Sequence, residues 1–217
     1  MKKCIVLANG QPPSKKVFDY LNSIGYDKLI CADGGANSAF KYEFVPDYII
    51  GDLDSIKPEI YDYYYDKCEI IQITRQNDTD VEKCLKFAYK NKFKGVILLG
   101  ATGDRLDHSF CNLGITLKFF DKVRIRVIHQ RSILSVHQGV TTLKTIPGET
   151  ISIYGLDTKT KFESEGLKYP LKNFSLPFGM KESTSNIAIT NEVRLKIKGG
   201  KAFVIRDFNV MRKNGLL

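Results

Sequence analysis

Residues 46–55 restrict the fold of this chain more than any other stretch of its sequence. Tyr48, Ile49 and Ile50 follow one another without polar alternation, and Gly51 ends the run. Such a run is typical of a strand that is buried on both faces, as in a parallel sheet. Ligands of open α/β sheets bind beyond the carboxyl ends of such strands. We therefore expect a binding site directly after Gly51.

Two carboxylates, Asp52 and Asp54, follow this run at a spacing of two. Residues two apart in an extended segment point to the same side, so the two side chains can converge. Like charges that close repel unless a cation or a proton lies between them. A metal site is one interpretation. The alternative is a solvated acidic turn in which Asp54 and Ser55 cap the helix that Pro58 helps to start.

Apolar runs of the same kind recur through the first part of the chain, and helical stripes separate them. The expected strands are Lys3–Ala8, Leu29–Ala32, Tyr48–Gly51, Glu69–Thr74, Lys94–Leu99, Val123–Ile128 and Ile133–His137. The expected helices are Ser14–Ile24, a helix from Ala36, Pro58–Lys67, and a helix that a capping box of Thr79 and Glu82 begins. This alternation predicts an α/β domain with a mostly parallel sheet flanked by helices.

Two more loops place carboxylates at the same edge of the predicted sheet. Asp33, Gly34 and Gly35 follow the second strand, and the glycines would let the backbone approach an anion. Such a sequence is more often a simple turn. Asp78 and Asp80 precede a helix, where acidic residues are favoured in any case. A third carboxylate at this edge nevertheless strengthens the interpretation as a metal site.

The loop 100–108 combines glycines with Arg105 and Asp107 after another buried strand. An arginine and a carboxylate at a strand-to-helix turn suit an oligophosphate and its metal ion. An Arg–Asp ion pair that only braces the loop fits the sequence equally well. We interpret His108 as a hydrogen-bonding residue at the start of a helix and not as a ligand.

From Thr141 onward the apolar residues alternate with polar ones, and no long helix fits. The expected strands are Thr141–Ile146, Thr150–Tyr154, Ser164–Leu171, Asn186–Thr190, Glu192–Lys198 and Ala202–Asp207. Turn signals such as Pro147-Gly148 and Gly199-Gly200 separate them. Short alternating strands of this kind predict a small all-β sandwich or barrel. We therefore expect two domains, residues 1–138 and 139–217.

The net charge of +9 makes a nucleic-acid-binding module one alternative function. Residues 1–120 hold sixteen basic and sixteen acidic side chains, whereas residues 121–217 hold seventeen basic and eight acidic ones. In the second part, Arg194, Lys196 and Lys198 alternate with apolar residues, as on one solvated face of a sheet. This pattern predicts lysines that face solvent and discourage edge pairing, without a nucleic-acid-binding patch.

The five cysteines include no Cys-x-x-Cys pair, and four of them lie in apolar segments. Reduced, buried thiols in a cytoplasmic protein are the expectation from this pattern. The apolar run after Lys2 and Lys3 spans only Cys4–Ala8, which is too short for a signal peptide or a membrane span. We therefore expect a cytoplasmic protein that does not bind a membrane.

Several common signatures are absent from the sequence, including the Gly-x-x-x-x-Gly-Lys-Ser/Thr phosphate loop, Gly-x-Gly-x-x-Gly, Gly-x-Ser-x-Gly and His-Glu-x-x-His. The carboxylates instead follow separate strands, together with glycine turns and an arginine. That set suits magnesium with nucleotide phosphates, because magnesium prefers one or two carboxylates plus phosphate oxygens and water. The residues alone predict a metal-dependent phosphoryl-transfer enzyme that uses a nucleotide.

The ordered set of motifs resembles the thiamine pyrophosphokinase family. The motifs are Ala32-Asp33-Gly34-Gly35-Ala36-Asn37, Pro46 to Ser55, Asp78-Thr79-Asp80 with Lys83, Gly103 to Asn112 with Arg105, Asp107 and His108, Gly166-Leu167-Lys168-Tyr169, and Ser183-Thr184-Ser185-Asn186. Each motif is weak by itself. Together they cover nearly the whole chain, in order and at the spacing of the family.

The resemblance implies transfer of the pyrophosphoryl group of ATP to the hydroxyl of thiamine, which yields thiamine diphosphate and AMP. It implies magnesium as cofactor, and a homodimer that binds thiamine between the β domain of one subunit and the α/β domain of the other. The main alternative among enzymes is another ATP-dependent kinase or pyrophosphokinase of a small heterocycle.

The resemblance also implies roles for single residues. Asp52, Asp54 and Asp80 would hold magnesium, and the ATP site would be formed by Asp33, Gly34, Gly35, Asn37, Lys83 and Arg105. Asp107 would lie near the transferring phosphates and is our candidate for a general base. Ser183, Ser185 and Asn186 would meet the pyrimidine of thiamine. Tyr169 stands where animal members have a tryptophan against thiamine, and it still offers an aromatic face to the cationic thiazolium.

Overall fold

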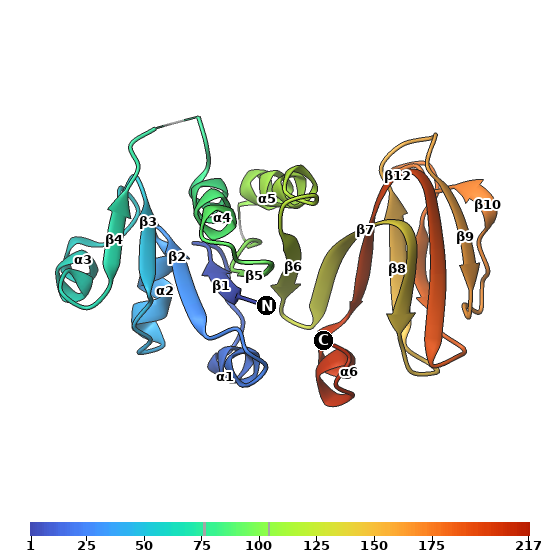
Figure 1. The fold of residues 1–217 in the computed structure, drawn as a ribbon, viewed down its shortest axis with the longest axis horizontal. Helices are drawn as coiled ribbons and strands as arrows, with labels where there is room; N and C mark the ends of the chain where they lie inside the picture. The colour runs from blue at the N-terminus through green and yellow to red at the C-terminus, as the bar shows by residue number, and fades with distance from the viewer. Residues whose placement is uncertain (76, 104) are drawn as a thin grey trace. The chain divides into compact units, whose positions relative to one another are not determined.

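The computed structural model describes residues 1–75, 77–103 and 105–217, and the chain divides into two units, Met1–Gln130 and Arg131–Leu217. Figure 1 labels their helices and strands. The domain boundary expected at residue 138 lies inside strand β7 (Ser132–Lys144) of the second unit. The segment Ile133–His137, expected as the last strand of the first domain, is the first part of this strand. Its pairing with a strand of the second unit explains this assignment.

The first unit is built on a parallel sheet. Its strands are β1 (Lys3–Leu7), β2 (Lys28–Ala32), β3 (Tyr48–Gly51), β4 (Glu69–Gln72), β5 (Gly95–Leu99) and β6 (Arg124–His129), in the order β6-β5-β1-β2-β3-β4. Every pair within this order is parallel. The expected parallel sheet is therefore confirmed, with strand ends within two residues of their expected positions.

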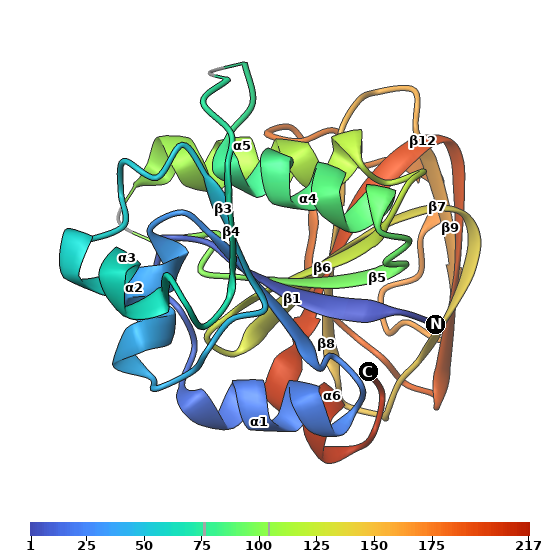
Figure 2. The ribbon, with the colours of Figure 1, turned by 60° about the vertical axis from the view of Figure 1, so that its left-hand side comes forward.

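Helices cover both faces of this sheet. They are α1 (Lys15–Ser23), α2 (Gly35–Lys41), α3 (Pro58–Tyr64), α4 (Asp80–Lys90) and α5 (Leu106–Lys118). Figure 2 shows α4 and α5 on one face and α1, α2 and α3 on the other. Because helices enclose the sheet, β5 is buried along its whole length, and Ile49 and Ile50 of β3 are fully buried.

The start of α4 is capped as expected on one side of the proposed capping box. Thr79 Oγ1 accepts a 3.2 Å hydrogen bond from the backbone N–H of Glu82. The Glu82 carboxylate instead lies 2.6 Å from Lys118 Nζ and 3.1 Å from Lys86 Nζ. The buried Glu82 carboxylate therefore pairs with these two lysines. Because Lys118 belongs to α5, its ion pair with Glu82 links α4 to α5.

The second unit is antiparallel. Its strands are β7, β8 (Thr150–Gly155), β9 (Lys161–Glu165), β10 (Lys172–Ser175), β11 (Ser183–Ile187) and β12 (Glu192–Asp207), and a short helix α6 (Phe208–Lys213) follows. β12 pairs with β7, β8 and β9, while β8 pairs with β11 and β9 with β10. Alternate residues of these strands, such as Val193, Leu195 and Ile197, form a buried apolar core.

Six of the expected strands in this unit are wrong in their limits. β7 and β12 are single long strands where two pairs of short strands were expected, because Gly199-Gly200 forms an irregularity between Ile197 and Lys201 and not a turn. The expected strand Ser164–Leu171 is broken, since β9 ends at Glu165 and β10 begins at Lys172. β11 begins at Ser183, three residues before the expected strand Asn186–Thr190.

All five cysteines are free thiols, of which Cys4, Cys31 and Cys84 are buried and Cys111 is exposed. Among the helices of the described residues, none has the length and apolar character needed to cross a membrane.

Candidate active site

A cavity of about 630 Å³ lies at the carboxyl edge of the parallel sheet in the first unit. Loops after β1, β2, β3 and β5 line it, together with the first turns of α4 and α5. The chain leaves β1 and β5, which are neighbours in the sheet, toward opposite faces, so the cavity lies at the topological switch point where α/β sheets bind ligands.

The loops that follow β1 and β5 are joined by backbone hydrogen bonds. Gly10 N donates to Gly100 O at 2.8 Å, and Gln11 N donates to Thr102 O at 2.9 Å. A Cβ atom on Gly10 would lie 2.4 Å from Gly100 O, so only glycine fits there. Asn9 and Gly10 line the cavity but were not among the expected site residues. Their position directly after a parallel strand is the sequence signal that marks them.

Three carboxylates converge at one end of this cavity. Oxygen atoms of Asp33, Asp52 and Asp80 lie within 4.8 Å of one another. Asp33 is buried, and the other two are half-buried. The Asp33 oxygens also accept hydrogen bonds from the backbone N–H groups of Ser55 (3.1 Å) and Ile56 (2.9 Å). Asp33 therefore ties the end of β2 to the loop that carries Asp52.

The surroundings of Asp33 favour its protonated form in the metal-free protein. The pKa of its carboxyl is raised from 3.8 to about 6: burial is the main cause, the charges of Asp80 and Asp54 add to it, and the hydrogen bonds from Ser55 and Ile56 oppose it. Such a shift is expected for a buried carboxyl that lies close to other acidic groups. The cluster is therefore a site where a proton or a metal cation is favoured.

Lys83 supplies one positive charge to this cluster. Its Nζ lies 2.8 Å from Asp80 Oδ1 and 3.9 Å from Asp52 Oδ2, and the side chain is 3% exposed. Burial by itself lowers the pKa of Lys83, but the hydrogen bond to Asp80 and the nearby carboxylates outweigh this effect and raise it. Three carboxylates and one ammonium leave a formal charge that a divalent cation would balance. Carboxylate oxygens are the hard ligands that magnesium prefers, so the donor set fits this ion.

Asp54, expected as a metal ligand beside Asp52, lies outside this group of carboxylates. It is exposed, and its Oδ1 accepts a 2.9 Å hydrogen bond from Ser55 Oγ. The chain between the two carboxylates is not extended, because Leu53 has a φ of 70°. The alternation that would point Asp52 and Asp54 to one side is lost there. Asp54 as a magnesium ligand stays a prediction.

Of the residues after β2 that were expected to bind the nucleotide, Gly34 lines the cavity, whereas Gly35 and Asn37 make contacts with other parts of the chain. Gly34 lines the cavity at the start of α2. A Cβ on Gly35 would lie 2.0 Å from Leu7 O, so this glycine lets α2 pack against β1. Asn37 braces the loop after β3, since its Nδ2 donates to Ser55 O and its Oδ1 accepts from Lys57 N.

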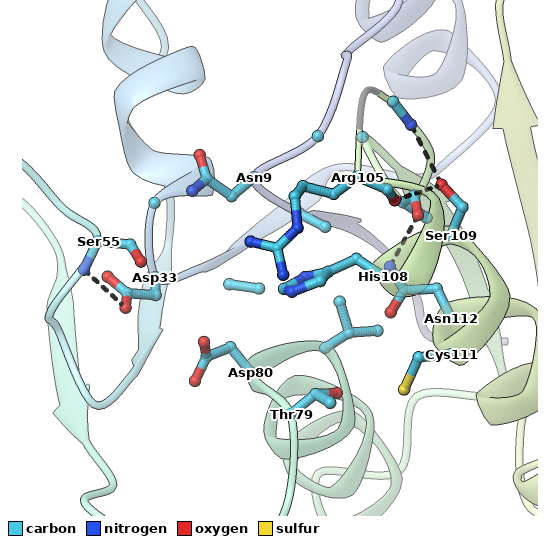
Figure 3. A pocket seen from close by; sticks show the side chains of 18 of the residues that line it. Asn9, Asp33, Ser55, Thr79, Asp80, Arg105, His108, Ser109, Cys111 and Asn112 are labelled. Carbon is cyan, nitrogen blue, oxygen red and sulfur yellow. Dashed lines mark hydrogen bonds between the residues drawn. The ribbon is translucent and has the colours of Figure 1, made fainter.

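Arg105 and His108 reach into the cavity from the side opposite Asp33 and Asp80, as Figure 3 shows. The guanidinium of Arg105 binds Asp107 through two hydrogen bonds, of 3.0 Å from Nε and 2.6 Å from the terminal nitrogen. The hydrogen bond from Arg105 holds the pKa of Asp107 well below its ordinary range. The expected ion pair of the loop is present, and His108 lines the cavity beside it.

Polar residues of α5 also line the cavity and were not expected as site residues. The buried Asn112 donates through Nδ2 to Ala101 O at 2.7 Å, and Ser109 Oγ donates to Arg105 O at 3.0 Å. Both side chains shape the loop after β5. Ser109 lies four residues after Arg105, and Asn112 lies three residues after Ser109. This spacing of about one helical turn is the signal that a search from the sequence could use.

The remaining expected residues belong to the second unit. Tyr169 is 60% exposed, while Asn186 is buried and hydrogen-bonded to the backbone of Tyr169 and to Ser183. Ser185 has a φ of 55°, and its N–H donates to Ser152 Oγ. The structure thus brings Tyr169, Ser183 and Asn186 together within one unit.

Comparisons with known proteins cover both units. Residues 23–129 match the family model of the thiamin pyrophosphokinase catalytic domain, and residues 132–201 match that of the thiamin pyrophosphokinase vitamin B1 binding domain. Thiamin pyrophosphokinase 1 of Caenorhabditis elegans is 30% identical over 227 residues, which cover 97% of this chain and 91% of the relative. Thiamine pyrophosphokinase 1 of rice is 29% identical, covering 76% and 74% of the two chains.

Solved structures show the same fold. Yeast thiamin pyrophosphokinase superposes with a TM-score of 0.83 at 17% identity, over 98% of this chain and 88% of that one. Thiamine pyrophosphokinase of Bacillus subtilis gives 0.81 at 21% identity, over 95% and 99%. The match of both domain models and the full-length similarity to the nematode protein identify this chain as a member of the thiamine pyrophosphokinase family, a family of transferases.

Proposed function

We propose that this protein transfers the pyrophosphoryl group of ATP to the hydroxyl group of thiamine, giving thiamine diphosphate, AMP and a proton. The observation that carries the proposal is the cluster of Asp33, Asp52 and Asp80 with Lys83 at the carboxyl edge of the parallel sheet. In a chain of this family, such a cluster is where the phosphates of ATP and their cation would be held.

The residues divide into groups by the charge they offer. Magnesium would be held by Asp52 and Asp80, with Asp54 as the third predicted ligand, and when bound it would neutralise charge on the phosphate oxygens. Lys83 and Arg105 would bind phosphate oxygens from either side, which orients the β-phosphorus for in-line attack by the hydroxyl. The backbone at Gly34 would lie against the nucleotide.

The role proposed for Asp107 is to hold Arg105. A carboxylate whose pKa is held far below its ordinary range is a weak base at neutral pH, so Asp107 is poorly suited to remove the proton of the hydroxyl. Its two hydrogen bonds fix the plane of the guanidinium instead. Asp107→Asn should therefore raise the KM for ATP more than it lowers kcat.

The acceptor site is proposed in the second unit, at Tyr169, Ser183 and Ser185. Tyr169 offers a largely exposed aromatic face to the cationic thiazolium. Ser183 and Ser185 belong to β11, which is joined to Tyr169 through Asn186, and their hydroxyls would bond to the pyrimidine. The basic residues of this unit include Arg194, Lys196 and Lys198, whose side chains pair with Glu163 and Glu165.

One assay tests the function. Purified protein is incubated with ATP, magnesium and thiamine, and the products are separated to measure AMP and thiamine diphosphate in equal amounts. Asp52→Asn should abolish turnover and leave the fold intact, whereas Asp62→Asn, at an exposed position of α3, should not. Release of ADP, or equal turnover of another heterocyclic alcohol in place of thiamine, would contradict the proposal and favour a different kinase.

The quaternary state and the location of the protein are proposed with the function. The homodimer implied by the family resemblance predicts that a mixture of inactive Asp52→Asn chains and inactive Tyr169→Ala/Ser183→Ala chains regains activity through hybrid sites. A monomer by light scattering at full activity would contradict it. We propose a cytoplasmic location because the chain has five cysteines, an odd number, and all of them are free thiols. Cell fractionation tests this location.

A further inference from the structure

We propose that Asn186 is a positioning residue for the thiamine site, which sets the place of Tyr169 and Ser183 without binding thiamine itself. The inference rests on the proposed function, since it assigns a role within the acceptor pocket. It replaces the direct contact with the pyrimidine that the family resemblance implies for Asn186.

The hydrogen bonds of the Asn186 amide leave no capacity for a ligand. Oδ1 accepts from the backbone N–H of Tyr169 at 3.1 Å and from that of Ile187 at 2.9 Å. Nδ2 donates to Tyr169 O at 2.7 Å and to Ser183 Oγ at 3.2 Å. An asparagine amide has two donor hydrogens and two acceptor lone pairs, so all four are used within the unit.

The orientation of this amide is fixed by its partners. A backbone N–H can only donate and a backbone carbonyl can only accept, so Oδ1 must face Tyr169 N and Nδ2 must face Tyr169 O. The side chain therefore pairs with the peptide groups of Tyr169 as a neighbouring strand would. At 2% exposure it is also shielded from any molecule at the surface.

A bulge in β11 explains how Asn186 reaches this position. The pairing of β11 with β8 shifts register between Ser183 and Asn186, and Ser185 takes a φ of 55°. Bulges of this kind redirect side chains relative to the regular alternation of a strand. Asn186 turns inward while Thr184 and Ser185 stay exposed. Tyr169, which lies outside the named strands, is thereby held against β11 with its ring in solvent.

A double-mutant cycle on thiamine kinetics tests the proposal. Tyr169→Ala and Asn186→Ala should each raise the KM for thiamine by roughly ten- to thirtyfold, which corresponds to losing a cation–π contact in a desolvated site. Neither should change the KM for ATP. If Asn186 acts through Tyr169, adding Asn186→Ala to Tyr169→Ala should raise the KM by less than about threefold more, because coupled residues are not additive.

Two results would overturn the proposal, and they are distinct. If both single variants weaken thiamine binding and their effects multiply in full, Asn186 does not act through Tyr169, and the proposed pocket stands without the positioning role. If Tyr169→Ala leaves the KM for thiamine unchanged, the proposed acceptor pocket itself is wrong. Ser164→Ala is the matched control, because it removes a side-chain hydrogen bond to the backbone N–H of Leu171, two residues beyond Tyr169, and should leave both KM values unchanged.

Hydrogen exchange in the unmodified protein guards against a variant that fails to fold. The backbone amide of Tyr169 should be protected without thiamine, although its side chain is exposed, because Asn186 Oδ1 accepts its hydrogen bond. Exchange of this amide at the rate of an unstructured peptide would overturn the positioning role.

Discussion

Lys83 donates a 2.8 Å hydrogen bond to Asp80, which lies three residues before it on the first turn of α4. Helical residues three apart lie on one face, so the sequence spacing brings the two groups together. Because Lys83 is buried, the carboxylates of Asp80 and Asp52 take the place of water around its ammonium group. Lys83 is therefore a cation that helps to hold the acidic cluster together.

Replacing this lysine should destabilise the metal-free protein. Lys83→Met retains most of the apolar stem but removes the ammonium that pairs with Asp80 and Asp52, at a cost of about 1–3 kcal/mol. Magnesium should recover part of the loss. Urea unfolding in EDTA and in magnesium measures both effects, with Lys90→Met, an exposed lysine of the same helix, as control. Equal stability of Lys83→Met and the parent protein in EDTA would show that the ion pairs contribute nothing.

The titration of Asp33 gives a second prediction, on the pH dependence of stability. Its carboxyl has a pKa of about 6 in the folded protein and an ordinary value of 3.8, so between these values the folded state binds the extra proton. This group therefore favours folding below pH 4, and its contribution is lost as the pH rises through 6. The loss is on the order of 3 kcal/mol for the protein without a bound metal ion.

The measurement compares melting temperatures of the parent protein and Asp33→Asn from pH 4 to 7.5, with EDTA and with magnesium. The difference between the two proteins should shift in favour of Asp33→Asn as the pH rises in EDTA. Magnesium should reduce this shift, because the cation stabilises the ionised carboxylates. A difference that is independent of pH would contradict the assigned pKa.

The sequence predicted the first unit well and its site only in part. Runs such as Tyr48–Gly51 and Gly95–Leu99 lack charged residues because helices cover both faces of the sheet, and this signal can be read from the local sequence. The place of Asp33 is not local: it joins Asp52 and Asp80 because β2 and β3 are neighbours and because its φ of 41° turns the chain. The prediction of convergence for Asp52 and Asp54 assumed an extended Leu53, which a φ of 70° excludes.

In the second unit, the type of structure was predictable but the strand limits were not. Gly199-Gly200 has the composition of a turn, yet β12 continues through it. A Cβ on Gly200 would lie 2.0 Å from Thr160 Oγ1, so the glycine serves close packing against a segment forty residues away in sequence. Likewise, the four hydrogen bonds of Asn186 depend on a bulge that no period of apolar residues reveals.

The buried ion pair of the second unit gives a third prediction. Arg206 of β12 binds Glu149 through hydrogen bonds of 2.6 and 2.8 Å and also donates to Lys144 O. The two side chains are 7% and 0% exposed. Glu149→Gln leaves a buried guanidinium without its counter-charge and should destabilise the protein by about 3–5 kcal/mol.

Replacing both members of this pair should cost less than replacing one. Glu149→Leu combined with Arg206→Met removes both charges and their desolvation together, so its free energy of unfolding should exceed that of Glu149→Gln. Denaturant unfolding of the three proteins decides the point. A double variant that is less stable than Glu149→Gln would show that the hydrogen bond to Lys144 O, and not the ion pair, dominates.

The last prediction concerns the aromatic residue of the proposed acceptor site. Lys168 Nζ lies 5.6 Å from the centre of the Tyr169 ring, so this ring already attracts a cation in the free protein. Tryptophan has the strongest cation–π attraction of the aromatic side chains. Tyr169→Trp should therefore tighten thiamine binding by about three- to tenfold, if the gain is about 0.6–1.4 kcal/mol. Tyr169→Leu, which is apolar but has no π face, should bind thiamine at least tenfold more weakly than the parent protein.

Isothermal titration with thiamine, and separately with ATP, measures both variants. Equal thiamine affinity for the tyrosine, tryptophan and leucine proteins would mean that burial alone, and not attraction of the thiazolium charge, fixes the substrate there.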